Sequence, residues 1–331
     1  MQTKRIFIAL WLSLSLWPVW VVSGQGQKEK AEPAAPKTLL KLPVAVTGAD
    51  EQFWRDGKRD SFKVFVEEKE VPLKSFQGPR TPTIILLVFD TVADLAVVEQ
   101  ARTALDSALD GLAENHWLAV MQAQDGLAVL QEPTPQRALI REKIQTVKVN
   151  GKAGLLDTLE PVSKLATGMM QKAGVRVCIF YVTDSGIGNY RADYLNPVIN
   201  ASDSGDLSRR FSDRAVQERM SRLGEELAGY TIPLFILHLS YRSDTLNLAY
   251  QSGLERIAAA SGGIAMFCRT QNEIPTATQA ILERIQNTYF LGIEPPNVKR
   301  RTLKLRVTAQ DSAGESLPRV QYANQLNLRK K

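Results

Sequence analysis

The pattern of hydrophobic and polar positions changes character twice along the chain. Residues 39–80 alternate between apolar and polar, as in FKVFVEE, and residues 290–331 do so again, as in TLKLRVTAQ. Between them, residues 81–289 carry continuous apolar runs separated by amphipathic segments. Alternation with a period of two predicts strands with one exposed face, whereas a short continuous apolar run predicts a strand covered on both faces.

Three continuous apolar runs in the central region predict buried strands. They are TIILLVFD from residue 83, VRVCIFYVTD from residue 175 and IPLFILHLS from residue 232. The segment after the first run has Val98, Ala101 and Leu105 at helical spacing, and Asp94 precedes it as a candidate N-cap. Asp125-Gly126 separates two strand-like runs, which is a hairpin signal.

Strands that alternate with helices indicate a three-layer, doubly wound α/β domain with a mostly parallel sheet. We therefore predict such a domain at residues 81–289. We expect it to be inserted into a small β-domain, which residues 39–80 begin and residues 290–331 complete. Residues 25–38 are rich in Pro, Ala and charge, and we interpret them as a flexible tether.

The first 24 residues have the features of an export signal. Lys4 and Arg5 precede an apolar run of 17 residues, and small residues follow before Gln25. Cleavage there would make the protein periplasmic or extracellular. The alternative is an uncleaved anchor, although the run is shorter than the ~20 residues of a spanning helix and Pro18 interrupts it. We expect membrane attachment only in that case.

Composition narrows the classes of partner and cofactor. With 44% hydrophobic and 23% charged residues, the chain is globular, and its net charge of +6 forms no basic stripe with interleaved aromatics. We therefore expect no nucleic-acid partner. An exported protein could join Cys178 and Cys268 in a disulfide, but we favour two buried free thiols, because another strand should lie between them. His116 and His238 are far apart, so a zinc site is not expected.

Two of the predicted buried strands end in an aspartate, Asp90 and Asp184. The carboxyl ends of parallel strands meet at one edge of the sheet, where doubly wound folds bind ligands. Adjacent buried carboxylates need a cation, a proton or backbone donors, and Mg²⁺ is the hard cation suited to oxygen ligands. The other interpretation is that Asp90 caps its turn and Asp184 binds loop amides.

Several motifs, in order, resemble a von Willebrand factor type A domain of the kind found in exported bacterial proteins and described first in Acidobacteria. They are DSFKVFVEEKEVPLKSFQ, ILLVFDTVAD, KAGLLDTLEPV, FYVTDSG, LERIAAASGGIAMF and NTYFLGIEPPN. The resemblance implies a metal-ion-dependent adhesion site built from two aspartates, two serines and a threonine. Asp90, Asp94 and Asp184 would be its remaining ligands, since Val92 and Ala153 offer no side-chain oxygen. The site would thus be degenerate, with Mg²⁺ as a possible residual cofactor.

The function expected from these features is non-catalytic binding of a protein partner, of the adhesion or scaffold type, at the carboxyl edge of the sheet. Thr91, Ser185, Tyr190 and Tyr194 are the candidate contact residues. Mg²⁺-dependent adhesion through the three aspartates is the alternative. A hydrolase is less favoured, because G-x-S-x-G is absent and no glycine-rich loop follows the first strand. Ser185 with His238 is its candidate pair.

Overall fold

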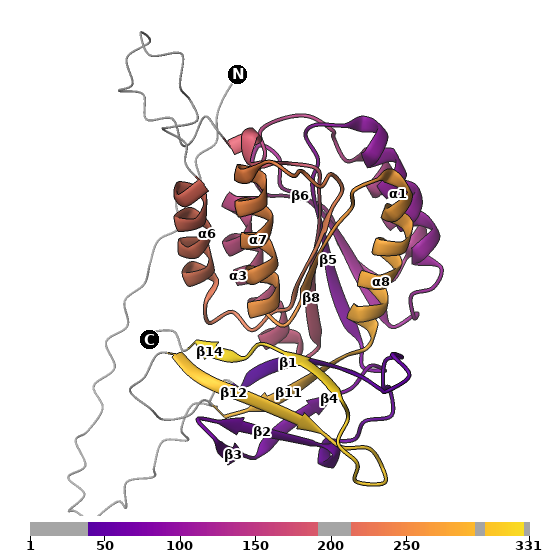
Figure 1. Ribbon diagram of the computed structural model, residues 1–331. Coiled ribbons are helices and arrows are strands. Elements are labelled where there is room, and N and C mark those ends of the chain that lie inside the picture. Colours follow the sequence, from indigo (N-terminus) through magenta and orange to yellow (C-terminus); the bar gives the residue numbers. More distant parts are fainter. Residues whose placement is uncertain (1–38, 191–212, 295–301, 328–331) are drawn as a thin grey trace, which may run out of the picture. The chain divides into compact units, whose positions relative to one another are not determined.

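The three continuous apolar runs form three neighbouring strands of one six-stranded sheet (Figure 1). The structure is a computed structural model that describes residues 39–190, 213–294 and 302–327. The strand order is β10-β9-β8-β5-β6-β7, in which all neighbours pair in parallel except the edge strand β7. The bounds are β5 Thr83–Asp90, β6 His116–Gln122, β7 Ala128–Thr134, β8 Arg176–Thr183, β9 Leu234–His238 and β10 Ile264–Phe267.

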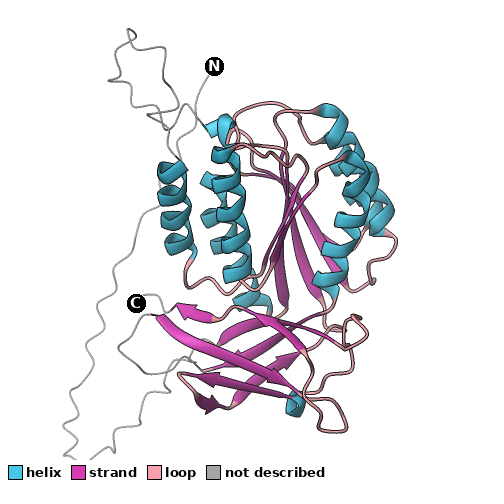
Figure 2. Cartoon of the chain, viewed as in Figure 1, coloured by secondary structure: helices cyan, strands magenta, loops and turns pink. Residues whose placement is uncertain are grey.

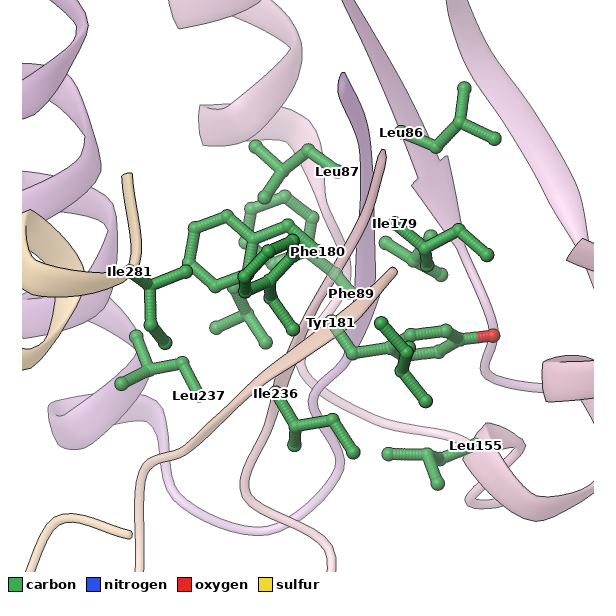
Figure 3. Close-up of a cluster of buried hydrophobic side chains, with 14 of the residues drawn as sticks. Leu86, Leu87, Phe89, Leu155, Ile179, Phe180, Tyr181, Ile236, Leu237 and Ile281 are labelled. Carbon is green, nitrogen blue, oxygen red and sulfur yellow. The ribbon is translucent and has the colours of Figure 1, made fainter. Parts of the chain in front are cut away.

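Helices cover both faces of this sheet (Figure 2), which explains why its central strands are apolar throughout. In Figure 3, Leu87 and Phe180 lie on the side of Ile281 from α8, while Tyr181 lies on the side of Leu155 from α3. The prediction of a three-layer, doubly wound α/β fold is therefore confirmed. The helices are α1 Leu95–Leu109, α2 Arg137–Thr146, α3 Leu155–Ala173, α6 Asp213–Leu227, α7 Thr245–Ala260 and α8 Ile274–Gln286.

The alternating segments form two antiparallel four-stranded sheets, ordered β13-β1-β11-β4 and β14-β12-β2-β3. They share an apolar core in which the rings of Phe62 and Tyr289 lie 4.9 Å apart. Strands from both ends of the chain pair here, and β11 enters directly after α8, so the predicted small β-domain is present. Its strands are β1 Leu40–Thr47, β2 Phe62–Val66, β3 Lys69–Val71, β4 Leu73–Gln77, β11 Thr288–Ile293, β12 Thr302–Ala309, β13 Arg319–Tyr322 and β14 Gln325–Asn327.

A buried arginine, which the sequence did not single out, joins three segments at the start of β8. Arg176 donates hydrogen bonds to the carbonyl oxygens of Thr288, Pro79 and Thr81, at 2.5, 3.0 and 2.8 Å. Burial lowers the pKa of Arg176 to about 10. The guanidinium thus ties the central sheet to β11 and to the linker that precedes β5.

Cys178 and Cys268 are buried free thiols, and β9 lies between β8 and β10, as predicted. The hairpin at Asp125-Gly126 is confirmed by the antiparallel pairing of β6 with β7. Within the described ranges, no helix combines the length and the apolar character needed to cross a bilayer. The expected signal and tether, and Tyr194, lie outside these ranges.

Candidate functional site

Asp90 and Asp184 come together at the carboxyl edge of the six-stranded sheet. Asp90 is the last residue of β5, and Asp184 follows the neighbouring strand β8. The backbone nitrogen of Asp184 donates to the carbonyl oxygen of Asp90 at 3.4 Å. Both residues are fully buried. The register of two parallel strands, which pairs Asp90 with Thr183, therefore brings the backbones of the two aspartates together at one edge, although 94 positions separate them in the chain.

The Asp184 carboxylate is held by backbone amides of the loop that follows β5. Oδ1 accepts from the nitrogen of Val92 at 2.7 Å, and Oδ2 accepts from the nitrogens of Ala93 and Asp94 at 2.9 and 2.8 Å. This loop leads directly into the N-terminus of α1, where a negative charge is favourable. The Asp184 carboxylate therefore binds the backbone amides of the loop, which is one of the two roles left open by the sequence.

The Asp90 carboxylate is held mainly by hydroxyl groups. Oδ1 accepts from the backbone nitrogen of Gly154 at 2.8 Å, while Oδ2 accepts from Ser185 Oγ at 2.6 Å and from Thr183 Oγ1 and Tyr190 Oη, both at 3.2 Å. Burial raises the pKa of Asp90, and these hydrogen bonds act in the opposite direction. A carboxylate has about four lone-pair sites, and four donors approach this one.

Gly154 is a site residue that the sequence analysis missed. It precedes α3, and a Cβ built on it would lie 1.8 Å from the carbonyl oxygen of Ala123. Only glycine allows this close approach, and the approach brings its amide to Asp90. The available signal was a glycine directly before a predicted helix, next to the Ala153 position that the family resemblance had drawn attention to.

Asp90, Asp94 and Asp184, the predicted metal ligands, are not grouped as a ligand set in this structure. Among the described residues, no three His, Cys, Asp or Glu side chains are grouped so that they could hold a metal ion. Asp94 Oδ1 instead caps α1, accepting from the nitrogen of Ala96 at 2.9 Å. Oδ2 of Asp90 already accepts from three hydroxyls and Oδ2 of Asp184 from two amides, and Val92 and Ala153 offer no side-chain oxygen beside them, so this set of groups does not suit Mg²⁺.

Three predicted contact residues, Thr91, Ser185 and Tyr190, are buried, which corrects the expectation that a partner touches them. Thr91 Oγ1 donates to the carbonyl oxygen of Lys148 at 3.0 Å, and the other two bind Asp90. Their polar groups point inward because the buried carboxylate and the loop carbonyl need donors. The exposed side chains of this edge include Leu95, which is 59% exposed at the start of α1.

Ser185 and His238 do not form a nucleophile and base pair. His238 Nδ1 accepts from the backbone nitrogen of Ser240 at 3.3 Å, so Nε2 carries the proton and donates to the carbonyl oxygen of Ser185 at 3.0 Å. The Ser185 hydroxyl donates instead to Asp90. Burial lowers the pKa of His238 to about 4. The imidazole therefore positions the backbone after β8 and is not directed at the hydroxyl.

No family model matches the chain, and no curated protein matches its sequence. Several solved structures are similar at 10–14% identity. The PilB minor pilin from Streptococcus sanguinis is 14% identical with a TM-score of 0.46, and the match covers 65% of this chain and 63% of the pilin. The chain thus spans less than two thirds of the length of that pilin.

Two further structures carry the von Willebrand factor name. A von Willebrand factor type A protein from Catenulispora acidiphila is 10% identical with a TM-score of 0.43, covering 89% of this chain and 75% of that one. The vWF domain of the type V pili tip protein Mfa5 from Porphyromonas gingivalis is 13% identical with a TM-score of 0.41, covering 62% and 95%. These similarities concern the fold alone, and the strand order above defines that fold independently of them.

Proposed function

We propose that this chain is a non-catalytic protein-interaction module, of the adhesion or scaffold type, that binds a protein partner at the carboxyl edge of the six-stranded sheet. Binding at this edge does not depend on a metal ion. The proposal is supported by the hydrogen bonds through which two buried aspartates hold the loops of this edge. Asp184 holds the loop before α1, and Asp90 holds both the backbone before α3 and the segment after β8.

Loops fixed in this way suit recognition for a thermodynamic reason. Association requires interface loops to lose conformational freedom, and a loop that is already held loses less. Leu95, the first residue of α1, directly follows the fixed loop and has 59% of its surface exposed. Burying a leucine side chain fully against a partner contributes about 1.5–3 kcal/mol. The edge therefore offers an apolar contact on a preorganised backbone.

The proposal places the protein outside the cytoplasm, in the periplasm or the extracellular space. Its support is the sequence of residues 1–24, with Lys4 and Arg5 before the apolar run. Mass spectrometry of the protein from its native envelope tests this part. A mass that corresponds to a chain beginning at Gln25 is expected, whereas a full-length, membrane-extracted chain would favour the anchor.

The test of partner binding is crosslinking and pull-down from the native envelope, with and without chelator. A partner should be captured equally in both conditions, and Leu95→Lys should reduce its capture at least tenfold, which corresponds to about 1.4 kcal/mol. Trp117→Lys is the control, because Trp117 is also exposed but pairs with Ile84 near the opposite end of the sheet. Loss of capture on chelation, or an equal loss with Trp117→Lys, would contradict the proposal.

A further inference from the structure

Asp90 is a buried carboxylate that neutral groups surround. Three hydroxyls, from Thr183, Ser185 and Tyr190, lie within 3.2 Å of Oδ2. In the described part of the chain, no lysine or arginine forms an ion pair with Asp90. A buried charge is costly unless it is paired or fully hydrogen-bonded, so these hydroxyls carry the compensation that a cation would otherwise supply.

The three hydroxyls contact one another as well as Asp90. Thr183 Oγ1 accepts from the backbone nitrogen of Ser185 at 3.1 Å, and its own proton is shared between Asp90 and Ser185 Oγ, 2.8 Å away. The proton of Ser185 goes to Asp90 along the shortest contact, at 2.6 Å. The phenol of Tyr190 comes from another segment of the chain, η2 Ile187–Tyr190, and lies 3.2 Å from both Asp90 Oδ2 and Ser185 Oγ.

Tyr190 also ends a short segment that packs on the sheet edge and on α7. The backbone nitrogen of Ile187 donates to Asn247 Oδ1 at 2.9 Å, and the rings of Tyr190 and Tyr250 lie 6.0 Å apart. Ile187 and Tyr190 are both buried, whereas Gly188 and Asn189 between them are exposed. The segment is therefore attached at two points, one of which is the phenol on Asp90.

We propose that Tyr190, with Ser185 and Thr183, takes the place of a metal ion at Asp90, and that its phenol latches residues 186–190 onto the sheet edge. The latch is made of neutral hydroxyl donors, so it is closed whether or not divalent cations are present. It also explains why a tyrosine that the sequence predicts as a surface contact is buried. This inference concerns the closed edge itself and does not require the partner of the proposed function.

The test compares two tyrosine-to-phenylalanine variants. Tyr190→Phe removes the hydroxyl that binds Asp90 and also contacts Ser185 Oγ. Tyr181→Phe removes a hydroxyl that is also buried but binds Thr158 at 2.9 Å. Tyr190→Phe should lower the melting midpoint by about 3–9 °C. It should also speed amide hydrogen exchange in residues 186–190 roughly tenfold or more. Tyr181→Phe should leave exchange in that segment unchanged. Wild-type exchange there in Tyr190→Phe would overturn the latch.

Divalent cations give the second arm of the test. Millimolar Mn²⁺ or Mg²⁺ should leave the wild-type melting midpoint unchanged, because a ligand raises the midpoint only when it binds the folded form. A rise in the wild type that Asp90→Asn abolishes would show a cation at this carboxylate and would overturn the proposal. Should Asp90→Asn not fold, the exchange comparison of the two tyrosine variants decides alone.

Discussion

Asp184 accepts a hydrogen bond from the backbone nitrogen of Asp94 at 2.8 Å, and so joins the end of β8 to the residue that caps α1. Asp94 uses its own carboxylate for the cap, while Asp184 fixes its backbone. The sequence suggested both aspartates as ligands of one ion. In the structure, Asp184 instead binds the loop backbone, and Asp94 at the end of that loop caps the helix. Hydrogen bonds, and not a metal ion, thus hold this loop. The predictions below can be tested without a partner protein.

Asp184→Asn should destabilise the protein by about 2–4 kcal/mol. The variant loses the charge that three amides of the loop after β5 share, and it turns an amide NH₂ toward at least one of them. Urea unfolding measures the change. Asp94→Asn is the matched control, because asparagine caps a helix about as well as aspartate and should cost only a few tenths of a kcal/mol. Equal losses in the two variants would contradict the assigned role of Asp184.

Gly154→Ala should destabilise the protein by about 2–3 kcal/mol, since the new Cβ would meet the carbonyl oxygen of Ala123 at 1.8 Å and push the amide away from Asp90. Gly168→Ala serves as the control. That glycine lies inside α3 with nothing within 4 Å of an added Cβ, so alanine should stabilise the helix by about 0.5–1 kcal/mol. Thermal melts of both variants give the comparison, and a neutral Gly154→Ala would show that the loop can move.

His238 should make stability fall as the pH is lowered. Its pKa is about 4 in the folded protein and 6.5 ordinarily, so the unfolded chain binds the additional proton. The stabilisation is complete above pH 6.5 and is lost as the pH falls toward 4, by up to about 1.4 kcal/mol per pH unit. His116, whose pKa burial also lowers to about 4, acts in the same direction.

The measurement for His238 is the difference in unfolding free energy between wild type and His238→Gln at several pH values. Taking the difference cancels His116 and also Asp90, whose raised pKa has the opposite effect. The slope of the difference should be steepest between pH 6.5 and pH 4. A pH-independent difference would mean that the imidazole has the same pKa in the folded and unfolded states, and would contradict its burial without a proton.

Cys178 and Cys268 should resist alkylation until the protein unfolds. Burial raises the pKa of Cys178 to about 12 and that of Cys268 to about 11, so little thiolate is present near neutral pH. Mass spectrometry after iodoacetamide should find no adduct in the folded protein and two in urea. The melting midpoint should be the same with and without reductant, and a reductant-dependent midpoint would indicate a disulfide.

Periodicity alone determined the layered part of the fold. The apolar runs ending in Asp90 and Asp184 had to be covered on both faces, and the alternating runs at both ends of the chain had to expose one. The cap at Asp94 and the hairpin at Asp125-Gly126 were also predictable. Each of these features depends on residues close together in the chain, whose preferences are local.

The chemistry at the sheet edge was decided by tertiary structure. The sequence places Asp90 and Asp184 at strand ends, but it does not say that amides of Val92–Asp94 surround one and the phenol of Tyr190 binds the other. Nor does it predict that Arg176 binds the carbonyl of Thr288, 112 positions away. Which donor reaches a carboxylate depends on strand order, register and loop path. These are set only when the whole sheet is assembled, because a shift of one residue in register would direct the same side chains to the opposite face.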